Sequence, residues 1–256
     1  MSAHGNAADP HSLFVSDLHL WPSRPAITAL FIDFLAQRAC HAEALYILGD
    51  LFEYWAGDDD LEEAHHRSVI DALATCAVSG TRIYFMHGNR DFLIARRFAE
   101  AAQATLLSDP TLLALYGQRT LLSHGDAYCT DDTAYQDFRQ QVREPSWQTQ
   151  FLSQPLAARK AQIEAIRIRS EQEKSLKAED IMDVNPAAIT QLLREHHYPQ
   201  LLIHGHTHRP AMHRHMIDGH LCQRWVLGDW YEQGSCLRVD ASGCRNIALS
   251  PMAPAP

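Results

Sequence analysis

The sequence predicts a layered α/β fold with a helical insertion. Short apolar runs rich in β-branched residues alternate along the chain with longer segments of helical spacing. One stretch, from about residue 127 to residue 185, breaks this alternation because it contains helical sequence and no good strand. Hydrophobic residues make up 46% of the 256 residues, which is enough to bury the core of one large domain.

The elements follow in order along the chain. The clearest strands are predicted at Leu13–Ser16, Ala44–Leu48, Arg82–Met86, Arg119–Ser123 and Gln200–Ile203. Weaker strands are predicted at Leu112–Leu115, Arg224–Leu227, Cys236–Val239 and Arg245–Leu249. Helices are predicted at Pro25–Cys40, Leu61–Val78 and Phe92–Ala102, and Pro25 suits the first turn of a helix.

The insertion at about 127–185 is interrupted at Pro145 and Pro155, and it is basic although the chain carries a formal charge of -9. Its basic residues are Arg159, Lys160, Arg167, Arg169, Lys174 and Lys177. Two interpretations remain open. The insertion is either a solvated helical hairpin or a cap that touches an anionic substrate or an anionic membrane surface.

The chain ends and the composition set the expected context. We expect residues 1–12 to be a disordered leader, residues 13–250 to form a single domain and residues 251–256 to be a disordered tail. The first residues lack the basic start and apolar stretch of a signal peptide, and no run is long enough to cross a bilayer. The six cysteines contain no CxxC pair, which favours reduced thiols in a cytoplasmic protein. The negative net charge argues against a nucleic-acid partner.

Five short polar motifs each follow a predicted strand. They are Ser16-Asp17-Leu18-His19, Gly49-Asp50, His87-Gly88-Asn89-Arg90-Asp91, Ser123-His124-Gly125-Asp126 and His204-Gly205-His206-Thr207-His208. Because ligands of open α/β sheets gather at the carboxyl ends of strands, the five motifs can converge on one site. Each motif alone is weak, since a single Gly-Asp after a strand is usually a turn and a single histidine is more often structural. All five in this order leave a purely structural explanation little room.

The residue types of the motifs suit a dinuclear metal centre. Carboxylates, imidazoles and one amide oxygen fit manganese, iron or zinc, and the absence of thiolates argues against a structural zinc cage. Asp17 and His19 are two apart on an extended segment and point to the same side, and His206 and His208 share that spacing. A carboxylate such as Asp50 can bridge two ions that lie roughly 3.5–4 Å apart.

The motifs resemble the DxH, GD, GN[HR][DE], lone H and GHxH blocks of the calcineurin-like metallophosphoesterase superfamily, from Leu13 to about Arg209. The resemblance implies a sandwich of two β-sheets flanked by helices, with the insertion as a family-specific part. It also implies two sets of metal ligands, with Asp17, His19 and His208 on one ion and Asn89, His124 and His206 on the other. Asp50 would bridge the two ions, and His204 and Asp126 would lie beside the ligands.

Arg90 bears on the class of substrate. Many phosphomonoesterases of the superfamily have a histidine after the Gly-Asn pair, where it can act as general acid. Arginine cannot donate its proton at neutral pH, but it can stabilise charge on phosphoryl oxygens. A phosphate leaving from a pyrophosphate has a pKa of only about 6, so it can leave without a proton. Arg90 therefore favours anhydride hydrolysis, although an arginine that only pairs with Asp91 or another neighbour remains an alternative.

Longer segments carry a narrower resemblance. ALYILGDLFEYWAGDDD, FMHGNRDFLIARRF, LSHGDAYCTDDTAYQDFR, IMDVNPAAI and LIHGHTHRPA are similar to the UDP-2,3-diacylglucosamine pyrophosphohydrolase family of Gram-negative lipid A synthesis. The resemblance implies that a metal-activated water splits UDP-2,3-diacylglucosamine into UMP and 2,3-diacylglucosamine 1-phosphate (lipid X). It implies two Mn²⁺ per chain, with Asp50, Arg90 and His124 as the catalytic residues. It further implies a cytoplasmic enzyme that rests peripherally on the inner membrane, and we expect a monomer.

The same resemblance implies a set of substrate contacts. They are Asn89, Arg90, Asp132, Ser170, Lys177 and His206, and Lys174 stands at a contact position where the family often has asparagine. In the insertion, apolar surface for the acyl chains is offered by Phe138, Val142, Trp147, Phe151, Leu152, Leu156, Ile163 and Ile166. Arg159 and Lys160 are candidates to meet lipid phosphates, although ordinary core packing is the better expectation for most of these residues individually.

Two rival functions are considered. One is a hydrolase of soluble substrates, such as a dinucleoside polyphosphate or a phosphoprotein, and both the insertion and Asn89-Arg90 speak against it. The other is a non-catalytic scaffold that keeps the fold, and such a protein has no need to retain every ligand position as this chain does.

Overall fold

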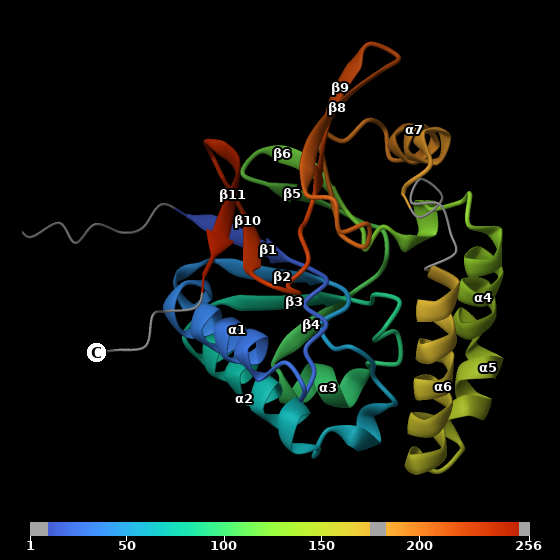
Figure 1. Ribbon diagram of the computed structural model, residues 1–256. Coiled ribbons are helices and arrows are strands. Elements are labelled where there is room, and N and C mark those ends of the chain that lie inside the picture. Colours follow the sequence, from blue (N-terminus) through green and yellow to red (C-terminus); the bar gives the residue numbers. More distant parts are fainter. Residues whose placement is uncertain (1–9, 175–182, 251–256) are drawn as a thin grey trace, which may run out of the picture.

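The computed structural model describes residues 10–174 and 183–250, which form two β-sheets packed face to face with helices outside them (Figure 1). Most of the predicted leader, Lys177 and the predicted tail lie outside the described residues. The two-sheet sandwich that the family resemblance implies is confirmed.

The larger sheet has six strands in the order β11-β10-β1-β2-β3-β4. Its strands are β1 (His11–Val15), β2 (Ala44–Leu48), β3 (Arg82–Met86), β4 (Ala104–Leu107), β10 (Gly234–Asp240) and β11 (Gly243–Leu249). Strands β1 to β4 run parallel, and their register pairs Val15 with Ile47 and Ile47 with Phe85. Three motif-bearing strands, β1, β2 and β3, therefore end at the same level of the sheet.

The smaller sheet has five strands in the order β5-β6-β7-β9-β8. Its strands are β5 (Thr111–Leu115), β6 (Gln118–Leu122), β7 (Leu201–His204), β8 (Ala211–Ile217) and β9 (His220–Val226). Strands β6 and β7 run parallel and pair Leu122 with Ile203, so the fourth and fifth motifs leave this sheet side by side.

Three apolar layers hold the sandwich together. The outer face of the six-stranded sheet packs against α1 (Pro25–Gln37), α2 (Ala64–Val78) and α3 (Arg96–Ala101). A second layer fills the space between the sheets, and a third joins the five-stranded sheet to α7 (Pro186–Glu195). Within β1, Leu13 and Val15 face the helices while Phe14 faces the other sheet, as the two-residue period of a strand requires. Burial on both faces explains why these strands read as continuous apolar runs.

The insertion forms three helices, α4 (Thr133–Arg143), α5 (Pro145–Leu152) and α6 (Leu156–Lys174), which we call the cap. The cap lies along one side of the sandwich (Figure 1). Pro145 is the first residue of α5 and Pro155 directly precedes α6, so both prolines stand at helix starts, where a missing N–H costs nothing. Asp132 precedes α4 and accepts a hydrogen bond from Tyr135 N at 3.1 Å.

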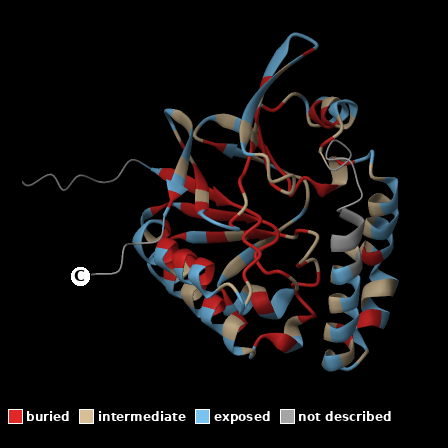
Figure 2. Cartoon of the chain, viewed as in Figure 1, coloured by how far each residue is buried: buried red, intermediate tan, exposed pale blue. Residues whose placement is uncertain are grey.

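Every predicted strand and helix exists, but in the described part of the chain two strands and one α-helix were not predicted. These are β4, β8 and α7. Strand β4 has only four residues, and β8 is an edge strand that exposes polar and apolar residues alike. Figure 2 shows the β8–β9 hairpin largely exposed while the central strands are buried. Strand β1 also begins at His11, two residues inside the predicted leader.

Two further observations bear on the sequence predictions. Within the described residues, no helix is long and apolar enough to cross a membrane. All six cysteines lie in the described part of the chain and all are free thiols.

Candidate metal centre

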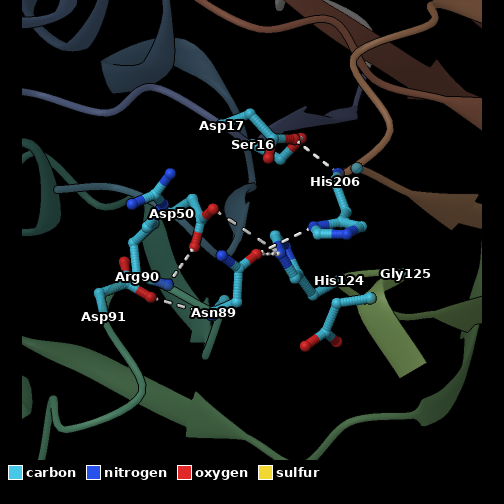
Figure 3. A network of polar contacts seen from close by, with 12 residues as sticks. Ser16, Asp17, Asp50, Asn89, Arg90, Asp91, His124, Gly125 and His206 are labelled. Atoms are coloured by element: carbon cyan, nitrogen blue, oxygen red, sulfur yellow. Dashed lines mark hydrogen bonds and ion pairs between the residues drawn. The ribbon is translucent and has the colours of Figure 1, made fainter. Parts of the chain in front are cut away.

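The five motifs meet where the two sheets end. Asp17 N donates to Gly49 O at 3.1 Å and His19 N donates to Asp50 O at 2.9 Å, so the first two motifs run side by side. Gly205 N donates to His124 O at 2.9 Å and joins the motifs of the smaller sheet. His206 N donates to Asp17 Oδ2 at 2.8 Å, which links the two sheets across the site (Figure 3).

The backbone turns sharply at the site. Asp17, His19, Asp50, His206 and His208 all have positive φ angles, between 49° and 68°. Positive φ is uncommon outside glycine, and such strained residues persist mainly at functional sites, where the surrounding structure holds them. The bends let consecutive motif residues point inward from strands that have already ended.

One group of candidate ligands consists of Asp17, His19 and His208. His208 Nε2 lies 3.3 Å from Asp17 Oδ1, and His19 Nε2 lies 4.0 Å from the same oxygen. These are the residues that the superfamily resemblance assigns to one ion.

The second group consists of Asp17, Asp50 and His124. Asn89 Oδ1 extends it, because this oxygen lies 3.1 Å from His124 Nε2 and 2.9 Å from His206 Nδ1 (Figure 3). Asp50 Oδ2 lies 3.8 Å from His19 Nε2 and 3.9 Å from His124 Nε2, so it stands between the two groups. The structure thus brings together all seven predicted ligands.

Three of the imidazoles have an acceptor behind the ring. His124 Nδ1 lies 2.8 Å from Leu48 O, His19 Nδ1 lies 3.7 Å from Glu53 Oε2 and His208 Nδ1 lies 3.6 Å from Asp229 Oδ2. In each ring Nε2 is the atom that faces the ligand group. His124 has the arrangement of a metal-binding histidine, in which an outer acceptor fixes the ring and its tautomer. The carboxylates that face His19 and His208 lie beyond hydrogen-bond distance and interact with these rings by charge alone.

Burial and mutual interaction shift the pKa values of these groups. Burial alone would raise the pKa of Asp17, but the imidazoles of His208, His124 and His19 outweigh it and lower the pKa. Burial would lower the pKa of His124, but the carboxylates of Asp50 and Asp17 raise it to about 9. Burial and the proximity of His124 lower the pKa of His206 to about 3. The site therefore brings together titratable groups that shift one another's pKa values, and Asp17, His19, Asp50 and His124 among them are buried.

The donor set fits divalent cations. Asp17 Oδ1 and His19 Nε2 are buried, and neither has a hydrogen-bond partner among the described residues. Burying carboxylate and imidazole atoms that make no hydrogen bond costs free energy, which a bound cation would offset. Oxygen and imidazole donors in two adjacent groups match a pair of hard or borderline cations.

A cavity of about 570 Å³ opens beside the candidate metal centre, between the sandwich and the cap. Its apolar wall includes Phe138, Trp147, Phe151, Ile163 and Ile166 from the cap and Trp55, Phe92 and Leu93 from the sandwich. Its polar wall includes Glu53, Asn89, Arg90, Asp132, Arg167, Ser170, His206, His208 and Arg209. The cavity thus joins an apolar chamber to the candidate metal ligands.

Most of the predicted substrate contacts lie on this cavity. Asn89, Arg90, Asp132, Ser170 and His206 all contribute to its wall. Lys174 is the last residue of α6, and Lys177 lies outside the described residues.

The expected contact of Arg159 with lipid phosphate is wrong. The side chain is buried against the sandwich, where it donates to Ala56 O and pairs with Asp59. Lys160 Nζ likewise lies 2.6 Å from Asp60 Oδ1. Both residues fasten the cap to the acidic Asp58–Asp60 turn through these ion pairs.

Several residues of the site were not predicted. Glu53 faces His19 and three arginines, Asp229 faces His208, and the ring of Tyr231 stacks on His19 with centroids 5.2 Å apart. The Gly228-Asp229 pair follows β9 and repeats the pattern of Gly49-Asp50, which is a signal that could have identified it. Glu53 and Tyr231 offer no such pattern.

Comparisons with known proteins agree with this geometry. Residues 11–210 match the calcineurin-like phosphoesterase family. A protein of Aromatoleum aromaticum named UDP-2,3-diacylglucosamine hydrolase is 54% identical, with 91% of this chain and 94% of the relative covered. A protein of the same name from Xanthomonas campestris pv. campestris is 51% identical, with 94% of this chain and 99% of the relative covered.

A solved structure, that of an archaeal phosphodiesterase, is similar at 12% identity and a TM-score of 0.47, with 93% of this chain and 99% of that chain covered. The match of the family over most of the chain and the two relatives at more than 50% identity decide the assignment. The chain belongs to the calcineurin-like phosphoesterases and, within them, to the family of the UDP-2,3-diacylglucosamine hydrolases.

Proposed function

We propose that this chain hydrolyses the pyrophosphate of UDP-2,3-diacylglucosamine to UMP and 2,3-diacylglucosamine 1-phosphate. The observation that carries the proposal is the cavity, in which an apolar chamber of the cap adjoins Asn89, Arg90 and His206. A diacylated nucleotide sugar has this same division into acyl chains and an anionic diphosphate. The names of the curated relatives support the same substrate.

The site residues are proposed to hold two Mn²⁺. Asp17, His19 and His208 would bind one ion, Asn89, His124 and His206 the other, and Asp50 both. Two bound cations supply Lewis acidity at a phosphoryl oxygen and lower the pKa of a water to about 7. The mixed oxygen and nitrogen donors suit manganese.

Arg90 is proposed to stabilise the charge that develops on the diphosphate. Its backbone N donates to Asp50 Oδ1 at 2.8 Å, so its position is tied to a candidate ligand. A guanidinium offers several N–H donors and remains charged at neutral pH. It cannot protonate a leaving group, and a departing phosphate does not require it, which favours the anhydride over a simple phosphomonoester. We expect attack at the α-phosphorus, so that UMP carries the new oxygen.

The cap is proposed to bind the acyl chains. Burial of apolar surface stabilises by roughly 25 cal/mol per Å², so the aromatic and aliphatic wall supplies affinity that a soluble nucleotide cannot use. Asp132 and Ser170 lie on the same cavity wall and are proposed to contact the head group, as are Lys174 and Lys177. We further propose a monomer without nucleic-acid partners that acts in the cytoplasm, peripherally on an anionic inner-membrane surface.

A comparison of two substrates tests the assignment of the acyl chains to the cap. UDP-2,3-diacylglucosamine and the same nucleotide sugar without acyl chains are offered to the manganese-loaded protein, and kcat/KM is measured for each. We expect the acylated substrate to be preferred by at least about 100-fold, which corresponds to about 2.7 kcal/mol. Equal kcat/KM values for both substrates, or cleavage of only soluble phosphoesters, would contradict the proposed lipid substrate. The assignment to the phosphoesterase family would still hold.

Membrane association has its own test. The protein is sedimented with vesicles of anionic or of purely zwitterionic phospholipid at low and high salt. We expect binding only to the anionic vesicles, weakened by salt because the attraction is screened. Equal sedimentation with both kinds of vesicle, or with neither, would contradict the proposed association with an anionic membrane surface.

A further inference from the structure

Glu53 is the point where arginines from three separate parts of the chain meet. Its Oε1 lies 2.6 Å from Arg167 Nη1 on α6 and 3.9 Å from Arg90 Nη1. Its Oε2 lies 3.1 Å from Arg24 Nη2 and 3.7 Å from His19 Nδ1. The side chain of Glu53 is 7% exposed, so these contacts are shielded from solvent.

The backbone fixes where this carboxylate stands. Glu53 N donates to Leu20 O at 3.1 Å, and Leu20 N donates to Leu51 O at 2.9 Å, so residues 51–53 extend alongside the first motif. Two residues later, Trp55 N donates to Arg90 O at 3.1 Å. The carboxylate of Glu53 and the backbone of Arg90 therefore belong to one rigid frame.

Glu53 makes two different kinds of contact with Arg167 and Arg90. Arg167 makes the close, hydrogen-bonded contact and comes from the cap, whereas Arg90 stands at a distance where attraction remains without a hydrogen bond. The N–H groups of Arg90 consequently stay available to the cavity that both arginines line. Without the carboxylate between them, two neighbouring guanidinium groups would repel each other.

We propose that Glu53 is a positioning residue that holds Arg90 toward the reacting diphosphate and that links this placement to the docking of the cap through Arg167. The proposal rests on the function proposed above, because it assigns Arg90 its role there. Glu53 itself touches neither substrate phosphorus nor leaving group in this scheme. It acts through Arg90.

A further ion pair of α6 serves as a control for the alternative that Glu53 only attaches the cap to the sandwich. Lys160 Nζ lies 2.6 Å from Asp60 Oδ1, so α6 makes another ion pair with the sandwich besides those of Arg159 and Arg167. Neither residue of this pair contacts Arg90 in the described structure. If Glu53 only fastened the cap, removal of either ion pair would have the same consequence.

The test is a double-mutant cycle on Glu53→Gln and Arg90→Met, with Lys160→Met as the control and with kcat, KM and Mn²⁺ affinity measured for each variant. We expect Glu53→Gln to lower kcat by about 10- to 100-fold, since a misplacement near 1 Å has effects of this order. KM and Mn²⁺ affinity should stay within about threefold of wild type. In the Arg90→Met background, Glu53→Gln should lower kcat by less than about twofold, because the group it positions is gone.

The outcomes separate cleanly. Additive losses in the cycle, or equal losses for Lys160→Met and Glu53→Gln, would overturn the positioning role. A loss of Mn²⁺ affinity that accounts for the lost activity would also overturn it, because Glu53 would then act on His19. If the wild type leaves UDP-2,3-diacylglucosamine intact but cleaves bis-p-nitrophenyl phosphate, the proposed substrate fails, and the same cycle on that diester still decides the role of Glu53.

Discussion

Arg90 is held through its backbone by two hydrogen bonds, and its guanidinium faces Glu53. Its backbone N–H donates to Asp50, its carbonyl accepts from Trp55, and its guanidinium stands 3.9 Å from Glu53. We predict that Arg90→Met lowers kcat by about 100- to 1000-fold, the usual effect of removing one preorganised electrostatic contact to the transition state. Arg90→Lys should recover only part of the loss, because an ammonium lacks the planar fork of donors.

Steady-state kinetics on the three proteins check this prediction. Arg96→Met serves as the control, because Arg96 is an exposed arginine on α3 that pairs with Glu100 and should tolerate the change. A kcat for Arg90→Met within twofold of wild type would contradict the proposed role.

Gly88 is required by close packing. A Cβ at this position would lie 2.0 Å from Asp50 Oδ1 and 2.4 Å from Asp50 N. We predict that Gly88→Ala displaces the Asp50 carboxylate and weakens Mn²⁺ binding by about 10- to 100-fold, as other disturbances of ligand orientation do. Titration calorimetry with Mn²⁺ measures the change.

The control for Gly88 is Gly219→Ala. A Cβ at Gly219 meets nothing within 4 Å, although its φ of +85° makes the backbone strained for alanine. This variant should lose stability and keep wild-type Mn²⁺ affinity. Equal affinity losses in both variants would show that backbone strain, and not contact with Asp50, is responsible.

At the scale of elements, α2 carries a histidine that should make stability depend on pH. His66 packs against both Phe52 and Trp55, and its Nδ1 lies 3.2 Å from Asp60 O. Burial lowers the pKa of His66 below its usual value, an effect that Asp60 and Glu63 only partly offset. The unfolded chain therefore binds a proton more readily than the native protein as the pH falls through about 6.5, and stability must fall with it.

We predict that His66→Gln loses less unfolding free energy than the wild type between pH 7 and pH 5. Urea unfolding at both pH values measures the two losses. The substitution costs packing at every pH, so only the difference between the two pH values bears on the prediction. Identical losses in the two proteins would mean that His66 does not titrate in this range.

The elements also show what local sequence can and cannot predict. Strands β2 and β3 were predicted to the residue, because β2 is a five-residue apolar run and the four residues of β3 after Arg82 are apolar or aromatic. Strand β8 escaped prediction because its residues Ala211–Ile217 lie at an exposed edge and follow no apolar alternation. The cap was predicted as helical, but its attachment was not, since Arg159 finds Ala56 and Asp59 across about 100 residues.

The residues of the candidate site also differ in whether the sequence predicts them. Its ligand motifs could be found because each follows a strand within one or two residues. Glu53 could not, because its closest partner, Arg167, is 114 residues away and no local pattern connects them. Pairing of charges that lie far apart along the chain cannot be predicted from a single sequence.

At the scale of the whole molecule, the two sheets contribute ligands to one site, so cations should hold the sandwich together. We predict that addition of Mn²⁺ at about 100 times its dissociation constant raises Tm by between about 5 and 10 °C, since binding to the native state alone adds about 2.7 kcal/mol. Chelation with EDTA should reverse the rise. Differential scanning calorimetry measures both changes.

Asp17→Asn is the matched variant for this prediction, because Asp17 belongs to both candidate ligand groups. Its Tm should respond to Mn²⁺ by less than about 2 °C. An equal response in wild type and variant would place the bound cations elsewhere.

The most direct measurement is product analysis on UDP-2,3-diacylglucosamine, with wild-type protein and Asp50→Asn each brought to a determined Mn²⁺ content. Asp50 stands between the two ligand groups, so its loss should remove activity without removing the cap or the cavity. The proposed function predicts equal amounts of UMP and 2,3-diacylglucosamine 1-phosphate from the wild type and a rate at least about 1000-fold lower from the variant. Intact lipid after incubation with wild-type protein that holds its two cations would contradict it.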